Sequence, residues 1–378
     1  RVDEGDFVMK PYPSYNDSGV EWIGEIPSGW DKKKLSYVTD QIGSGTTPKS
    51  DNELYYQNGT IPWMVTGDLN DGDILYVENK VTELAMEKHS SLKLYKEGSV
   101  SIAMYGATIG KLGFIKIPVT VNQANCVFVL DKDNFPKFWF YVFMGFRPQI
   151  ISLGYGGGQP NISQDLLKSL RFGCPDKQEQ QQISNYLDHK TRQIDTLIEN
   201  TQQKIELLKE QRTSLINRIV TKGLNPNVEM KDSGVEWIGE IPSGWEITKF
   251  KFIGEVIIGL SYKPNDIVDE HNGTLVMRSS NIQNGKPSFL DNVYVKTEIS
   301  EKLRTKEGDI LICSRNGSQK LIGKNCVITK DIEGMSFGVF MTIFRSQDWE
   351  FVYWVLNSQI FKSQSGLYLT STINQLTV

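Results

Sequence analysis

The string DSGVEWIGEIPSGW at Asp17–Trp30 recurs without a change at Asp232–Trp245, 215 residues later. Weaker matches follow both copies in the same order. The matched segments are Gly59–Met64 with Gly273–Met277, Lys96–Gly98 with Lys306–Gly308, Gly110-Lys111 with Gly323-Lys324, Phe138–Phe143 with Phe351–Leu356, and Ile162–Leu166 with Ile373–Leu376. An ordered series of this kind predicts one fold used twice, a common scaffold whose interior has diverged.

The repeat divides the chain into five segments. We expect a lead-in and first repeat edge, a first domain, a long helix, a linker with the second repeat edge, and a second domain, at residues 1–30, 31–175, 176–222, 223–245 and 246–378. Both expected domains have the length of a single folded unit. Two interpretations of residues 1–8, which precede Met9, stay open: a vector-derived extension or native sequence.

Asp176–Lys222 is a run without Gly or Pro that predicts one long helix of roughly 70 Å, at ~1.5 Å per residue. Asp176 and Glu179 have the spacing of a capping box, and Gly223 fits a C-terminal cap. One apolar stripe persists along the run, at Ile183, Leu187, Ile194, Ile198, Ile205, Leu208, Leu215 and Ile219. This favours a coiled-coil spacer over an ordinary core helix, although the chain does not obviously supply a partner helix.

The two expected domains are mixed α/β (α+β) in sequence pattern. Asn-Gly and Gly-rich steps separate short β-rich runs such as Cys126–Leu130 and Gly338–Phe344. Aromatic-rich helices are expected at Lys137–Met144 and at Glu350–Leu356. The fold class is therefore two similar mixed α/β domains separated by a long spacer helix, with a pseudo-twofold internal repeat.

The composition limits where in the cell the protein is expected and which metal or disulfide sites it could form. The chain has no apolar run of the ~18 residues that span a bilayer and no signal peptide, so we expect a cytoplasmic protein without a membrane role. The four cysteines make no CxxC pair and the three histidines are far apart. This pattern indicates free thiols in a reducing compartment and no metal site.

Charge is distributed unevenly within a net charge of −4. The acidic excess lies on the two repeat edges, whereas each domain has one window without Asp or Glu, at Gly98–Leu130 and at Ile310–Lys330. Lys and Arg contact phosphates, and Asn, Gln and Arg read base edges. The windows, together with Lys49 and Arg278 outside them, supply the candidate DNA-binding residues Lys49, Tyr105, Thr108, Lys111, Asn122, Gln123, Arg278, Arg315, Asn316, Lys320 and Lys324. Solvated loops that merely lack acids are the alternative.

No catalytic motif is found. The string GATIGKL at Gly106–Leu112 has three residues between its glycines and no Ser or Thr after the lysine, so it does not match a P-loop. No methyltransferase motif, nucleophile elbow or acid–base cluster is present either. The sequence therefore predicts a non-catalytic chain.

The repeated 14-mer, GTIPWM at Gly59–Met64, the KEGSV, GATIGK and NQANC succession, and NISQDLLKSLRF leading through PDKQEQQQI into the long helix resemble the specificity subunit of Type I restriction–modification enzymes. The resemblance runs from Met9 onward and repeats in the second half through INQLTV.

This resemblance implies two target recognition domains that each read one half of a bipartite site in double-stranded DNA. It also implies that the spacer helix docks modification (methyltransferase) subunits, two of them, and that restriction subunits complete the complex. S-adenosylmethionine, ATP and Mg²⁺ are then expected on the partner subunits and no cofactor on this chain.

One departure concerns the end of the chain. Specificity subunits carry a second long helix after the second recognition domain, and Val378 lies where the segment before that helix would stand. Truncation and a shortened natural form both stay open. A coiled-coil adaptor with duplicated protein-binding domains and no DNA role is the alternative function.

Overall fold

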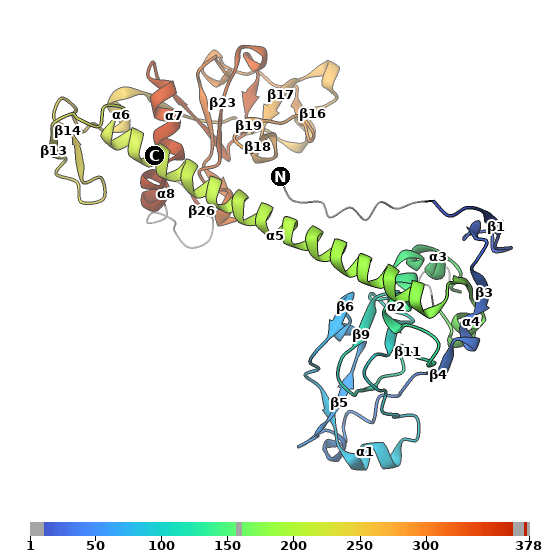
Figure 1. Cartoon of the computed structure of the whole chain (residues 1–378). Coiled ribbons are helices and arrows are strands. Elements are labelled where there is room, and N and C mark those ends of the chain that lie inside the picture. Colours follow the sequence, from blue (N-terminus) through green and yellow to red (C-terminus); the bar gives the residue numbers. More distant parts are fainter. Residues whose placement is uncertain (1–10, 156–160, 366–373, 376–378) are drawn as a thin grey trace. The chain divides into compact units, whose positions relative to one another are not determined.

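The computed structural model describes residues 11–155, 161–365 and 374–375 (Figure 1). Residues 1–8, whose origin the sequence leaves open, lie outside the described part. The chain divides into two compact units, Arg1–Ile198 and Glu199–Val378, called the first and the second unit below.

A five-stranded sheet of order β4-β11-β8-β9-β6 forms the centre of the first unit. Its strands are β4 (Thr39–Gly43), β6 (Gly72–Ile74), β8 (Val100–Ala103), β9 (Leu112–Ile115) and β11 (Asn125–Leu130). Alternate residues of β11 face opposite sides, as the period of two requires. Cys126 and Phe128 pack in one core cluster with aromatic residues of helix α2 (Pro136–Gly145), whereas Val127 and Val129 belong to a second cluster.

A smaller sheet completes the first unit, with β5 (Ile61–Met64) parallel to β10 (Thr120–Val121) and antiparallel to β7 (Lys80–Val81). Strand β3 (Asp31–Lys34) pairs with β12 (Arg171–Cys174), and this unit also contains helices α1 (Glu83–Lys88), α3 (Arg147–Ser152) and α4 (Gln164–Ser169). The helix predicted at Lys137–Met144 is confirmed as α2, whose Phe138, Trp139, Phe140 and Phe143 are buried.

The second unit repeats this plan. Its main sheet has the order β15-β25-β21-β23, and a second sheet has the order β16-β20-β17-β24. Strand β17 is again parallel to one neighbour, β24, and antiparallel to the other, β20. The strands are β15 (Glu255–Ile258), β16 (Ile267–Val268), β17 (Thr274–Met277), β18 (Ile282–Gln283), β19 (Lys286–Pro287), β20 (Tyr294–Val295), β21 (Ile310–Cys313), β22 (Arg315–Asn316), β23 (Asn325–Val327), β24 (Ser336–Phe337), β25 (Met341–Arg345) and β26 (Asn374–Gln375).

Helix α7 (Trp349–Asn357) covers one face of this main sheet, as α2 does in the first unit. It confirms the helix predicted at Glu350–Leu356. The other helices are α6 (Phe250–Ile253) and α8 (Gln359–Ser365). The mixed α/β class and the prediction of one fold used twice are thus confirmed.

The matched Gly-Lys steps form the same hydrogen-bonded turn in both units. Gly110 N donates to Ala103 O and Ala103 N to Lys111 O, each at 2.9 Å. In the second unit Gly323 N donates to Cys313 O at 2.9 Å and Cys313 N to Lys324 O at 2.8 Å. Both glycines have positive φ, 77° and 80°, a conformation that favours glycine.

The identical 14-mers also fold alike. The first supplies the turn and second strand of the hairpin β1 (Tyr15–Asp17) and β2 (Glu25–Pro27), and the second those of the hairpin β13 (Met230–Asp232) and β14 (Glu240–Pro242); each first strand begins two residues before the string. Each copy ends on a tryptophan that packs edge-on against the equivalent helix. Trp30 and Phe138 have ring centroids 6.4 Å apart, and Trp245 and Phe351 have theirs 6.0 Å apart.

The long helix is confirmed as α5 (Lys177–Lys222), 46 residues without a break (Figure 1). Asp176 caps it, since its Oδ1 accepts from Glu179 N at 2.8 Å. Glu179 does not complete a capping box among the described contacts, because its carboxylate accepts from Tyr12 Oη at 2.5 Å instead. Gly223 ends the helix with φ 69° and with its N donating to Ile219 O.

The apolar stripe of α5 is covered only near the helix ends. Ile183, Leu187 and Ile219 are half-buried, whereas Ile194, Ile198, Ile205, Leu208 and Leu215 are exposed. Within the part of the chain that the structure describes, no helix packs along this middle stretch. An exposed apolar stripe of this length is typical of a helix that meets a partner.

Candidate nucleic-acid interface

A cleft of about 710 Å³ lies in the second unit, where three segments far apart in the sequence meet. Strand β21 ends at Cys313 and delivers Arg315 and Asn316, the end of β17 delivers Arg278, and the turn before β25 delivers Phe340. The parallel pairing of β17 with β24 and the antiparallel pairing of β21 with β25 bring these segments together.

Hydrogen bonds hold the floor of this cleft in place. Ser314 Oγ and Arg315 N both donate to Phe340 O at 3.1 Å. Thr342 Oγ1 donates to Ser314 Oγ at 2.8 Å, and both of these residues are buried. The backbone at Arg315 is therefore fixed, while its side chain is half-buried in the cleft.

Three sequence-predicted candidates, Arg278, Arg315 and Asn316, line this one cleft. Two of them are already engaged. Arg278 pairs with Asp291 at 2.9 Å, and Asn316 donates to Ser279 Oγ at 3.2 Å while its Oδ1 accepts from Ser318 N. Lys324 lies beside the cleft and donates to Ser279 O at 3.2 Å, whereas Lys320 is exposed on the short helix Gln319–Leu321.

The other residues that line the cleft were missed by sequence reasoning, among them Tyr262, Ser279, Asp291 and Phe340. Phe340 is 58% exposed, which is unusual for an aromatic residue next to a buried strand. Phe340 lies after the second acid-free window, at a position equivalent to the stretch around Gln123 and Ala124. This weak alignment was the only feature of the sequence that could have pointed to Phe340.

The equivalent loops of the first unit carry different side chains. Tyr105 stands where Arg315 stands and packs against the core of its own unit. Gln123 is exposed and accepts from Thr47 Oγ1 at 2.7 Å. Asn122 is used structurally, because its Oδ1 accepts from Asn125 Nδ2 at 3.0 Å.

The other candidates in the first unit differ in exposure. Lys49 and Lys111 are exposed and Thr108 is half-buried, with its backbone O accepting from Lys111 N at 2.9 Å. The GATIGK segment joins the antiparallel strands β8 and β9. A phosphate-binding P-loop instead joins a strand to a helix, so the geometry agrees with excluding one.

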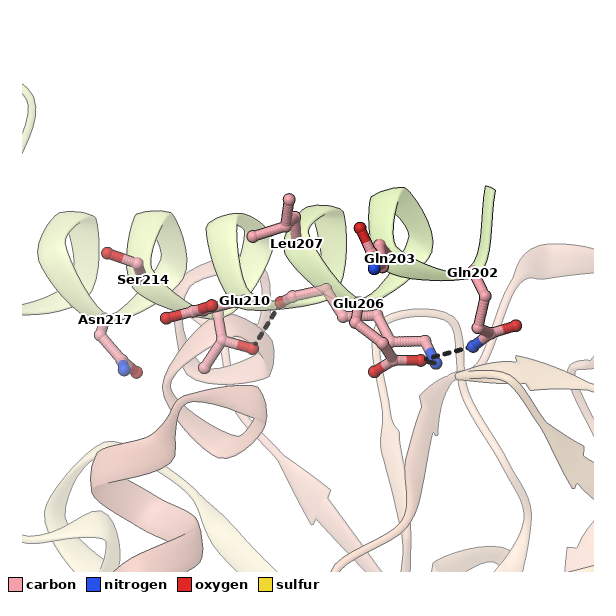
Figure 2. A pocket seen from close by; sticks show the side chains of 9 residues that line it. Gln202, Gln203, Glu206, Leu207, Glu210, Ser214 and Asn217 are labelled. Atoms are coloured by element: carbon pink, nitrogen blue, oxygen red, sulfur yellow. Dashed lines mark hydrogen bonds and ion pairs between the residues drawn. The ribbon is translucent and has the colours of Figure 1, made fainter. Parts of the chain in front are cut away.

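A second hollow, of about 980 Å³, runs along α5 (Figure 2). All of its lining residues belong to this one helix, and Glu206 accepts there from Gln202 at 3.1 Å and from Lys209 at 2.9 Å. Because no other element contributes a side chain, it is the surface of an open helix face and offers no converging groups for chemistry.

The titratable groups of the described residues do not converge as in a reaction centre. The four cysteines are free and buried, and burial raises the pKa of Cys126 and Cys326 to about 12. Among the described residues, no group of three His, Cys, Asp or Glu side chains could hold a metal ion. The helices within that same part of the chain include none with the length and apolar character to cross a membrane.

Comparison with known proteins shows what this chain is similar to. The family described as "Type I restriction modification DNA specificity domain" matches residues 27–207. The MjaVIII specificity subunit of Methanocaldococcus jannaschii is 26% identical over 97% of this chain and 83% of its own length. The MjaIX specificity subunit of the same organism is 28% identical over 66% of this chain, which spans 57% of that relative.

Solved structures share the fold. The HsdS subunit from Thermoanaerobacter tengcongensis aligns with a TM-score of 0.56 and 16% identity, over 93% of this chain and 85% of that one. A chain from a study of complex assembly and conformational transition of the type I R-M system aligns with a TM-score of 0.68 and 15% identity, over 93% and 84%. The resemblance inferred from the sequence motifs is confirmed: the chain is similar to Type I restriction–modification specificity subunits, in one relative over nearly its whole length.

Proposed function

We propose that this chain addresses a Type I restriction–modification complex to double-stranded DNA, with each of its two similar domains reading one half of a bipartite site. One observation carries this proposal. The same hydrogen-bonded turns hold Tyr105 and Lys111 in the first unit and Arg315 and Lys324 in the second. A common scaffold with different side chains at matched positions suits two readers of different sequences.

The division of labour follows from the family. Residues 31–175 and 246–378 act as target recognition domains, and the helix between them docks two modification subunits. Its exposed apolar stripe and the acidic, duplicated repeat edges support this docking. Restriction subunits join the same complex in the cytoplasm, and S-adenosylmethionine, ATP and Mg²⁺ bind to the partner subunits.

Charge reversal tests DNA binding. Lys111→Glu and Lys320→Glu change exposed lysines, so the fold should persist while affinity for duplex DNA falls. A plot of log K against log salt concentration has a negative slope, and each lost phosphate contact should make that slope less steep by ~0.9. Lys88→Glu, an exposed lysine on α1 outside both acid-free windows, is the matched control. Filter binding is measured with and without the modification subunits, over a series of salt concentrations.

The result separates the two candidate functions. Unchanged slopes in both test variants would move the DNA surface away from these windows. Binding of protein partners with no DNA retention under any condition would favour the adaptor. Lys324→Glu is a poor probe, because Lys324 is half-buried and its reversal also breaks the hydrogen bond to Ser279 O.

A further inference from the structure

We propose that Arg315 is the base-reading residue of the second domain and that it recognises a guanine in the half-site which that domain binds. This rests on the proposed function and goes further, since it names one side chain and one base. The inference comes from comparing Arg315 with the other basic and amide side chains at the cleft.

The neighbouring cations are engaged by the protein itself. Arg278 Nη2 is held by Asp291, through the ion pair at 2.9 Å and by donating to the Asp291 carbonyl at 3.3 Å, whereas the buried Arg278 Nε has no partner among the described residues. Lys324 donates to Ser279 O, and Asn316 donates to Ser279 Oγ. Within the part of the chain that the structure describes, the Arg315 guanidinium has neither an ion pair nor a hydrogen bond, although its backbone is fixed.

The surroundings of Arg315 favour a base over a phosphate. The half-buried side chain of Arg315 lies inside the cleft, which the exposed ring of Phe340 also lines. Phosphates are reached more readily by the exposed Lys320, which lies on the short helix Gln319–Leu321. A fixed backbone also places the guanidinium fork in a reproducible position, which directional pairing with a base edge requires.

The chemistry of the fork selects guanine. Arginine has donors only, and guanine offers two adjacent acceptors, O6 and N7, in the major groove. Adenine offers one acceptor beside a donor, and cytosine a donor, so neither can accept both bonds. In the first domain the equivalent residue is Tyr105, which cannot make this bidentate contact, so the guanine preference should be confined to one half-site.

The test uses the full chain assembled with its modification subunits. The complex selects duplexes from a library with both half-sites randomised, and the bound fraction is sequenced. The unchanged protein should enrich guanine at one position of the second half-site by about 5- to 150-fold over other bases. Arg315→Ala should abolish that enrichment while all other positions keep their preferences. Arg315→Lys keeps the charge but not the fork, and should lose most of it.

Lys320→Gln is the matched control, a neighbouring cation whose loss should weaken all sequences alike. Circular dichroism verifies that each variant folds. If Arg315→Ala does not fold, the loss of guanine enrichment is judged from Arg315→Lys alone. Base preferences that survive in a folded Arg315 variant, with uniformly weaker binding, would make Arg315 a phosphate contact and overturn the inference. A complex that enriches no sequence even without substitution would instead overturn the proposed function.

Discussion

Trp22 and Trp237 occupy the same position of the identical 14-mer yet lie in different surroundings. Trp22 is half-buried, and its ring packs edge-on against Phe146 at 5.2 Å and Phe172 at 5.5 Å. Trp237 is 48% exposed, and Gln359, which stands where Phe146 stands, lines the hollow beside it. The local hairpin is encoded by the string, but the environment of its tryptophan is supplied by distant residues.

Replacing Trp22 by alanine should therefore destabilise the first unit by about 2–3 kcal/mol, less than a fully buried tryptophan would cost. Trp237→Ala should change stability by less than about 1 kcal/mol. Thiol alkylation along a denaturant series, resolved by mass spectrometry, reports on each unit separately. Cys126 and Cys174 belong to the first unit and Cys313 and Cys326 to the second.

The raised pKa of Cys126 and Cys326 keeps these native thiols protonated at pH 8, so they should react only after unfolding. In Trp22→Ala, labelling of the first-unit cysteines should shift to lower denaturant while that of the second-unit cysteines stays in place. Equal shifts in both tryptophan variants would contradict the assignment of Trp22 as a packing residue.

An internal ion pair is a second residue-scale feature, in the second unit. Asp309 is 1% exposed and receives two hydrogen bonds of 2.7 Å from Arg345 and one of 2.8 Å from Lys306 N. Hydrogen bonding to Asp309 raises the pKa of Arg345. Ser99 stands at the equivalent place in the first unit, so the pair is specific to the second.

Asp309→Ala should lower the free energy of unfolding of the second unit by about 3–5 kcal/mol, because it leaves the Arg345 charge without its partner. Glu301→Ala removes the exposed partner of Arg304 and should make no measurable difference. Urea unfolding followed by labelling of Cys313 and Cys326 measures both. A small effect of Asp309→Ala would mean that water reaches Arg345 and replaces the carboxylate.

At the scale of elements, α5 is anchored by side chains near its start and its end. Tyr141 Oη donates to Asp188 Oδ1 at 2.5 Å in the first unit, and Asn217 Oδ1 accepts from Gln359 N at 2.7 Å in the second. Residues 192–215 between these contacts are exposed. A helix held in this way can be lengthened in its middle without disturbing either anchor.

Inserting one heptad into residues 192–215 should lengthen the helix by ~10.5 Å and keep the apolar stripe on one face. If the helix sets the half-site spacing, the preferred spacer in the DNA should grow by about three base pairs, at ~3.4 Å each. That change also rotates one half-site by roughly a third of a turn, so activity is expected to fall even where spacing follows. Methylation of a library with randomised spacer lengths measures the preference.

A four-residue insertion at the same place is the matched comparison. It displaces the stripe by half a heptad and should weaken binding of the modification subunits more than the heptad does. An active heptad variant that retains the original spacer length would show that the helix does not set the distance.

At the scale of the whole molecule, the two units carry separate cores. The sheets of each unit and the helices that cover them come from that unit's own residues. Both units carry the identical 14-mer, whereas the side chains at matched loop positions differ, as Tyr105 and Arg315 do. This organisation predicts that recognition is modular.

Exchanging residues 31–175 for the equivalent domain of another specificity subunit should change one half-site of the methylated sequence and leave the other as it was. Single-molecule sequencing of methylated genomic DNA identifies both halves. The same exchange of 246–378 is the reciprocal control. A chimera in which both halves change would show that the domains do not read independently.

Much of this architecture could be predicted from local sequence. The length and ends of α5 follow from a run without Gly or Pro, a capping Asp176 and a terminal Gly223, which all act within one turn of the helix. The Gly-Lys turns and the repeated hairpins likewise depend on neighbours, so identical strings gave identical structures. The resemblance to specificity subunits followed from the order of these motifs.

Only the tertiary structure decided which candidates lie together. Arg278 and Arg315 are brought to one cleft by the pairing of β17 with β24 and of β21 with β25, contacts that residue spacing does not reveal. The engagement of Arg278 by Asp291 and of Lys324 by Ser279 likewise depends on that arrangement. Local strings determine turns, helices and caps because those need only near neighbours. The exposure of a side chain and its unused hydrogen-bonding groups depend instead on which residues from distant parts of the chain pack against it. The different surroundings of Trp22 and Trp237 demonstrate this.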